Sequence, residues 1–250
     1  VVRAWPRQWL RKELRLQQTS LLVAGCFLAG WLLNIGAHEI WPSVQLAFLG
    51  LFQPVYSAFM ALLIGALGCA EERHHGMLEA QLILPVSPRR QWYLKAAACH
   101  GLALGLAVVL PALLRLLTPA DPEGGPVTFE LKWTDWFLVM TPMTVLFTSF
   151  ALYASSVSRS TVRALLVSIL VTMALVGSLP SLLRDEGLLQ AIVAWWGPVR
   201  WYEWLSQRCA MICLICAAGL ALTLLAFANY RTLEQRAGRV VIHLGGVLAG

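Results

Sequence analysis

The sequence predicts an all-α integral membrane protein with six transmembrane helices. The chain of 250 residues is 58% hydrophobic and only 13% charged, whereas globular domains carry about 25% charged residues. In addition, six apolar runs without any Asp, Glu, Lys or Arg lie at about residues 19–37, 44–70, 96–114, 136–157, 164–183 and 209–228. These two observations together predict a single transmembrane domain over residues 1–250.

Each run is long enough to cross roughly 30 Å of bilayer hydrocarbon as a helix that rises about 1.5 Å per residue. A closed β-barrel also satisfies every backbone group in lipid, but these runs are too long and too continuously apolar for barrel strands. The first run follows a charged stretch and precedes no small-residue cleavage site, so we expect it to remain as a span. Prolines within the runs are expected to kink their helices, and these are Pro54, Pro111, Pro142 and Pro180.

The basic residues are distributed unequally between the predicted loops. Residues 1–18, 71–95, 158–163 and 229–250 hold 14 of the 19 basic residues and five of the 13 acidic ones. The positive-inside rule places these segments in the cytoplasm. We therefore expect a multi-pass protein of the plasma (inner) membrane with both termini cytoplasmic. Anionic lipid of the inner leaflet accounts for the net charge of +6 without nucleic acid as a partner.

Two segments outside the runs are also apolar enough to touch the membrane. Residues 5–18 mix apolar and basic side chains, which predicts an amphipathic helix in the cytoplasmic interface; an extension of the first span is the alternative. Residues 184–208 form two apolar stretches divided by Gly197-Pro198. They predict two short helices that dip into the outer leaflet before the sixth span, with a surface loop on lipid as the alternative.

Catalytic and metal-binding motifs are largely missing from this sequence. His38-Glu39 begins like the zinc motif HExxH, but Pro42 stands where the second His is needed. Without a GxxxxGK[ST] pattern, the chain has no P-loop of its own to bind ATP, and it is not expected to be an enzyme or to hold a metal. A membrane-embedded hydrolase that uses His74, His75 and Glu71 or Glu72 remains an alternative.

The six cysteines fall within the runs or at their ends, and they are Cys26, Cys69, Cys99, Cys209, Cys213 and Cys216. They are interpreted as small apolar residues that pack between helices rather than as a metal or redox site.

Polar residues inside the runs are candidate markers of a passage, because they are costly in lipid. Gln53 and Ser57 lie in the second run, and Thr141, Thr144 and Thr148 recur at helical spacing in the fourth. Packing between helices is the alternative explanation. Because the runs contain no carboxylate, they indicate a passage without its own ion-coupled energy source.

The charged segment 71–95 separates the second run from the third. Its first half has apolar side chains along one face of a predicted helix, which Pro85 ends. Ser87 can cap the next helix, with Pro88 at its first position and Arg89 at the membrane surface. The pattern predicts an amphipathic helix parallel to the bilayer that offers one face to a cytoplasmic partner.

This segment resembles the corresponding part of the type-2 ATP-binding-cassette (ABC) exporter permeases. That family has a pattern like E-x-x-x-G-x-L-E-x-x-L-x-L-P-V-S-R between its second and third spans. The chain matches it with Glu72, Gly76, Leu78, Glu79, Leu82, Leu84, Pro85, Val86 and Ser87, while Pro88 intrudes before Arg89. Lys95 falls where the family often has a base at the entry to the third span.

The resemblance implies the transmembrane subunit of an ATP-driven exporter, in which segment 71–95 contains the coupling helix. Partners would be a cytoplasmic ABC ATPase, which binds the ATP and Mg, and a second permease copy or homologue in a homo- or heterodimer. Contact with the ATPase is expected over residues 72–85 and their flanks, with these candidates: Glu71, Glu72, Arg73, Gly76, Leu78, Glu79, Leu82, Pro85, Ser87 and Arg89. A non-transporting membrane anchor of a complex is the alternative function.

Overall fold

The structure is a computed structural model that describes residues 12–37, 52–74, 87–117, 133–158, 160–182 and 201–230. Over these residues the chain is helical and contains no strand, in agreement with the predicted all-α class. The elements are α2 (Gln18–Ala37), α4 (Gln53–His74), α6 (Pro88–Leu104), a π-helical turn η2 (Gly105–Val109), α7 (Leu110–Leu117), α8 (Trp133–Val157), α9 (Thr161–Leu182) and α11 (Trp201–Tyr230).

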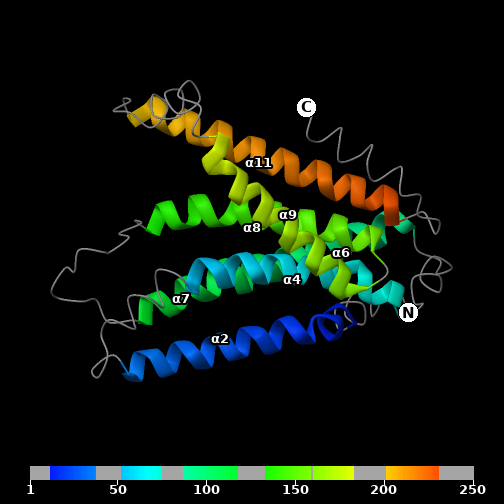
Figure 1. Ribbon diagram of the computed structural model, residues 1–250, viewed down its shortest axis with the longest axis horizontal. Helices are drawn as coiled ribbons and strands as arrows, with labels where there is room; N and C mark the ends of the chain where they lie inside the picture. Colours follow the sequence, from blue (N-terminus) through cyan, green and yellow to red (C-terminus); the bar gives the residue numbers. More distant parts are fainter. Residues whose placement is uncertain are drawn as a thin grey trace.

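Within the described residues, four helical stretches are long and apolar enough to cross a membrane. They are Gln18–Gly36, Gln53–Ala70, Pro88–Leu117 and Phe137–Val157, while α9 and α11 contain shorter apolar stretches, Thr161–Ala174 and Ile215–Tyr230. The helices lie side by side with similar directions, except that α9 runs obliquely across the bundle (Figure 1). An array of apolar helices is the form that lipid imposes, since every backbone group must find its partner inside its own helix.

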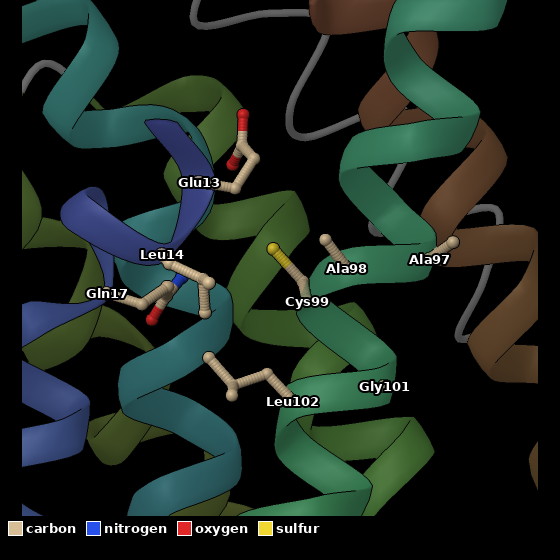
Figure 2. A pocket seen from close by; sticks show the side chains of 8 residues that line it. All are labelled: Glu13, Leu14, Gln17, Ala97, Ala98, Cys99, Gly101 and Leu102. Atoms are coloured by element: carbon tan, nitrogen blue, oxygen red, sulfur yellow. The ribbon is translucent and has the colours of Figure 1, made fainter. Parts of the chain in front are cut away.

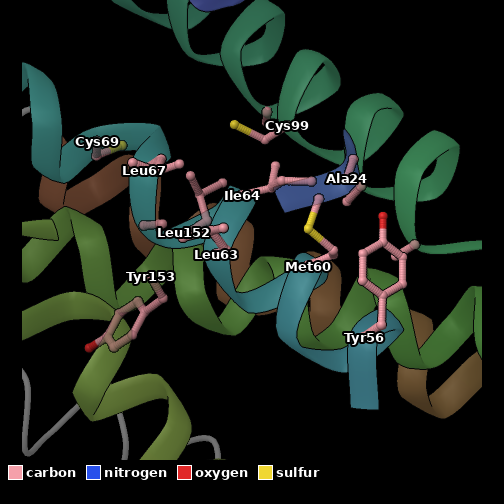
Figure 3. Packing of buried hydrophobic residues seen from close by; sticks show 14 of the residues in the cluster. Ala24, Tyr56, Met60, Leu63, Ile64, Leu67, Cys69, Cys99, Leu152 and Tyr153 are labelled. Atoms are coloured by element: carbon pink, nitrogen blue, oxygen red, sulfur yellow. The ribbon is translucent and has the colours of Figure 1, made fainter. Parts of the chain in front are cut away.

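Helix α4 is the centre of the bundle. In its apolar stretch 78% of the residues are buried inside the protein, against 17% in α2. It packs most extensively against α8 and also contacts α2, α6 and α9. Figure 3 shows the consequence, with side chains of α4 such as Met60, Ile64 and Leu67 lying among those of its neighbours. An all-round apolar helix of this kind is suited to a central position.

Two glycines allow α4 and α8 to approach closely. A Cβ atom added at Gly65 would lie 2.5 Å from the carbonyl oxygen of Thr148 and 2.7 Å from the Cβ of Ala151. One at Gly68 would lie 2.7 Å from a methyl group of Leu152. Small residues are the usual means of bringing membrane helices together, because lipid provides no hydrophobic force between them. Gly65 and Gly68 therefore set the spacing of the central helix pair.

The π-helical turn explains how the long helix α6–α7 accommodates a proline. Leu110 donates its N–H to the carbonyl of Gly105 rather than to that of Leu106, and the next residue, Pro111, has no N–H to donate. The carbonyl of Leu106 accepts a hydrogen bond from the hydroxyl of Tyr56 on α4 instead, at 3.1 Å. The π-helical turn just before Pro111 is the irregularity that accommodates this proline in the helix.

Several helix boundaries differ from the predicted runs. Helix α4 extends past the end of the second run at residue 70 to His74. Helix α6 begins at Pro88, ahead of the third run at residue 96, at the position that the sequence predicts for the start of a helix. Helix α11 begins at Trp201 as one helix of 30 residues. The prediction of a separate short helix just before the sixth span is therefore wrong for residues 201–208; residues 183–200 lie outside the described part of the chain.

We expect the substitution Gly65→Ala to destabilise the protein, because its Cβ would overlap α8. Overpacking of this kind costs roughly 1–3 kcal/mol. The measurement is the midpoint temperature at which detergent-solubilised protein loses its monodisperse elution. Gly25→Ala on α2 is the matched control, since an added Cβ there has no neighbour within 4 Å. Equal midpoints for the two variants would contradict the close approach.

Candidate functional site

Four charged side chains meet at the end of the bundle where α4 ends and α6 begins. The ammonium of Lys95 lies 2.5 Å from one carboxylate oxygen of Glu72, and that of Lys12 lies 2.6 Å from the other. Glu13 lies 3.6 Å from Lys95. These residues, here called the ion cluster, join the N-terminal segment 12–17 to the last turn of α4 and the second turn of α6.

The ion cluster is buried. Glu72 is 0% exposed, Lys95 1% and Glu13 3%, while Lys12 keeps 30% of its side chain accessible. A buried ammonium is tolerated only when it is paired and its protons are used. Lys95 meets this condition because it also donates to the carbonyl of Gly68, at 2.8 Å. Removal of either central partner would therefore leave an uncompensated charge in the interior.

The two carboxylates of the cluster respond differently to the same surroundings. Burial alone would raise the pKa of Glu72, but the attraction of Lys95 and Lys12 outweighs it and holds that pKa below its usual value. Burial raises the pKa of Glu13, and Lys95 offsets this only in part. With its lowered pKa, Glu72 stabilises the fold above the ordinary carboxyl pKa, and this contribution is lost as the pH falls through the folded-state value.

Segment 12–17 is also fixed by a neutral side chain. The amide of Gln17 donates to the carbonyl of Ile64 at 3.1 Å, and the hydroxyl of Ser20 donates to the amide oxygen of Gln17 at 2.9 Å. Gln17 and Ser20 are both buried. Residues 12–16 are helical and a turn at Gln17 leads into α2. This portion of the predicted interfacial helix 5–18 therefore lies against α4; residues 5–11 lie outside the described part.

The structure describes only part of the predicted ATPase-contact region. Glu71 and Arg73 lie on the helical backbone of α4, without a description of their side chains. Ser87 occupies the position before the first turn of α6, with Pro88 first in the helix as predicted, but its side chain makes no capping hydrogen bond. Ser87 and Arg89 are exposed. The remaining predicted contacts lie outside the described residues, namely Gly76, Leu78, Glu79, Leu82 and Pro85.

Glu72 differs from the expectation of an exposed contact residue, because it is fully buried within this chain. It precedes segment 75–86 by three residues, and Lys95 follows that segment by nine. The Glu72–Lys95 pair thus holds together the two helices from which segment 75–86 emerges.

Nearby, Trp92 packs on Tyr230 of α11 with ring centroids 5.3 Å apart, so the start of α6 also contacts the end of α11.

The candidate passage residues are buried or partly buried inside the protein. Gln53, Ser57, Thr144 and Thr148 are buried, and Thr141 is half-buried. Three of their polar atoms have no hydrogen-bond partner among the described residues, namely Nε2 of Gln53, Oγ of Ser57 and Oγ1 of Thr148. The close contact at Gly65 closes the α4–α8 seam beside Thr148.

A second polar contact within the bundle was not predicted from the sequence. Nε2 of His100 on α6 lies 2.9 Å from the hydroxyl of Ser149 on α8, and the hydroxyl of Thr223 on α11 lies 3.1 Å from the same oxygen. His100 and Ser149 are recognisable as polar residues within apolar runs, but their pairing needs the helix arrangement. Hydrogen bonds of this type connect membrane helices.

Among the described residues, no group of three or more His, Cys, Asp and Glu side chains could hold a metal ion. The described cysteines are thiols that are not joined in disulfides. Cys69 and Cys99 are buried, as expected for packing residues, whereas Cys26, Cys213 and Cys216 are exposed on their helices.

We expect Glu72→Ala to lower the stability of the protein by about 3–5 kcal/mol, the cost of breaking a buried ion pair from one side. The combined substitution of Glu72→Leu with Lys95→Met is expected to recover most of this loss, because no buried charge is left unpaired. Thermal unfolding in detergent measures both effects. Arg89→Ala is the control for charge removal at an exposed site on α6, and a loss no larger than in this control would argue against the pairing.

This chain matches no protein-family model, no curated protein and no solved structure.

Proposed function

We propose that this chain is the permease subunit of an ATP-driven exporter, related in mechanism to the type-2 ABC exporters. It would form the membrane passage as a homo- or heterodimer in the plasma (inner) membrane, with both termini in the cytoplasm. A separate P-loop ATPase would bind the ATP and Mg. This proposal extends the four apolar stretches to six spans by including α9 and α11, which have 22 and 30 residues.

The ion cluster is the observation that carries this proposal. Segment 75–86, which holds most of the motif shared with the exporters, connects α4 to α6. Glu72 and Lys95 hold these helices together at the base of the segment, and Lys12 adds the N-terminal segment. A force applied to segment 75–86 would then act on one rigid unit instead of bending a loose loop.

The position of α4 supports the next step of the mechanism. Because α4 is the most buried helix and packs against α8, α9, α6 and α2, a displacement of its cytoplasmic end is passed to most of the bundle. Close-packed helices move as bodies rather than deforming continuously. Closure of the ATPase dimer would in this way rearrange the spans, including the buried polar residues Gln53, Ser57 and Thr148 of α4 and α8.

The docking surface itself is proposed from the motif. Glu79 and Arg73 would make polar contacts with the ATPase, while Leu78 and Leu82 would anchor the helix in its cleft. Glu72 takes a different role from the other motif residues. It is buried and, through its pairing with Lys95, would hold together the helices that precede and follow segment 75–86.

The charge reversal Glu79→Lys tests the proposal. We expect wild-type protein, immobilised after expression in its native host, to retain a P-loop ATPase that mass spectrometry identifies, and its ATPase activity to change on reconstitution with the permease. In Glu79→Lys, retention and the change in activity should fall by roughly tenfold or more, the effect of losing about 1.4 kcal/mol of binding.

Glu234→Lys is the matched control, because it reverses a charge in another segment predicted to be cytoplasmic. Equal insertion of both variants into membranes, checked by extraction at high pH, excludes a folding defect. The absence of any P-loop ATPase from the wild-type complex would contradict the exporter function, and equal retention by Glu79→Lys would contradict the assigned docking surface.

A further inference from the structure

A cavity of about 350 Å³ separates the N-terminal segment from α6. One wall is formed by Glu13, Leu14 and Gln17, and the other by residues 97–99, 101 and 102 of α6 (Figure 2). This volume lies within the range of about 300–1,000 Å³ that is typical of small-molecule sites. The cavity is adjacent to the ion cluster, because Glu13 belongs to both.

The cavity opens sideways, toward the outside of the bundle. Leu14, Ala97 and Gly101 are exposed, whereas Cys99 and Gln17 are buried at its base. The α6 wall is smooth because it consists mainly of small residues. A Cβ atom added at Gly101 would have no neighbour within 4 Å, so the absence of a side chain there leaves space that the surrounding protein does not fill.

The depth of the cavity corresponds to the cytoplasmic edge of the hydrocarbon. Along α6, charged residues end at Lys95 and the apolar stretch begins at Ala96. Ala97 lies nine residues from the start of the helix, which is about 14 Å along its axis. The continuous helical stretch Pro88–Leu117 has 30 residues and is about 45 Å long, which exceeds the roughly 30 Å of hydrocarbon. Its charged first turns therefore belong in the headgroup region, and the cavity lies just beneath them.

The polar end of the cavity is an incompletely paired carboxylate. The ammonium of Lys95 lies 2.5 Å from Glu72 but 3.6 Å from Glu13, which is longer than a hydrogen bond. The oxygen of Glu13 that faces Lys95, Oε1, accepts no hydrogen bond from any of the described residues. Glu13 is thus the member of the ion cluster whose charge is least compensated, and its raised pKa is consistent with this position.

We propose that the cavity binds one phospholipid of the inner leaflet, with an acyl chain along Leu14, Ala98 and Leu102 and a primary amine of the headgroup donating to Glu13. An acyl chain fits the apolar, sideways-open walls, which a polar solute from the cytosol would not match. A primary ammonium supplies both the charge and the hydrogen-bond donor that Glu13 lacks. This inference rests on one part of the proposed function, namely that the chain inserts into a membrane. It does not depend on export.

Photo-crosslinking tests the acyl-chain contact. The probe is phosphatidylethanolamine with a diazirine group in one acyl chain, at low molar fraction in phosphatidylcholine vesicles that contain the purified full chain. Peptide mass spectrometry is expected to find an excess of crosslinks at residues 97–102. In Gly101→Leu, which fills the cavity, these crosslinks should fall about tenfold as several methylene contacts are lost.

Gly25→Leu is the matched control, because Gly25 is exposed on α2 and also has free space around an added Cβ. Its crosslinks at residues 97–102 should equal those of the wild type. Uniform labelling of all exposed helices without an excess at residues 97–102 would indicate annular lipid only and overturn the proposal. Labelling of Gly101→Leu that is as strong as that of Gly25→Leu would overturn it as well.

The headgroup is tested by changing the probe and the acid separately. With a photoactivatable phosphatidylcholine, whose amine cannot donate a hydrogen bond, labelling should fall roughly tenfold or more, as for one lost charge-assisted hydrogen bond. In Glu13→Gln, the two probes should label residues 97–102 equally. Equal labelling of the wild-type protein by the two probes would contradict the role of Glu13. Failure of the chain to insert into vesicles would instead disprove the membrane assignment shared with the proposed function.

Discussion

A lysine ammonium cannot remain in a protein interior unless opposite charge and hydrogen-bond acceptors come with it, and this requirement organises the end of the bundle where α4 ends and α6 begins around Lys95. To supply them, α4 must continue through Glu72 and expose the carbonyl of Gly68 to α6. Lys12 then compensates the second oxygen of Glu72 and brings the N-terminal segment with it. The position of three chain segments therefore follows from the solvation of one side chain.

The same requirement explains which features were predictable from the sequence. The helical class and the approximate positions of the helices follow from apolar runs, which are a local property that hydropathy measures directly. The apolar runs stop at residue 70 and resume at residue 96 because charged residues such as Glu72 and Lys95 interrupt them, whereas α4 continues to His74 and α6 begins at Pro88. Glu72 and Lys95 are buried in these helices as a pair, and that pairing across 23 residues leaves no trace in a local pattern.

The candidate site shows a similar division. The motif around segment 75–86 is visible as residue types at fixed spacing, whereas the roles of Lys12 and Glu13 depend on a contact between distant parts of the chain. The cavity beside them is harder still to foresee, because it results from small residues at positions 97, 98 and 101 that face a segment some eighty residues earlier. Small residues in an apolar run indicate close helix packing in most cases, as they do at Gly65 and Gly68. Whether such residues pack against a neighbouring helix or leave a cavity depends on the elements around them.

The π-helical turn before Pro111 makes two distant residues interdependent. The hydroxyl of Tyr56 serves the carbonyl of Leu106 because the proline at position 111 offers no N–H. If position 111 carried a residue other than proline, its backbone N–H could donate to the carbonyl of Leu106. The hydroxyl of Tyr56 would then lose its acceptor. The effect of a substitution at position 56 therefore depends on the residue at position 111, and the energetic costs of the two changes do not add. In evolutionary terms, the two sites are expected to vary together, although 55 residues separate them.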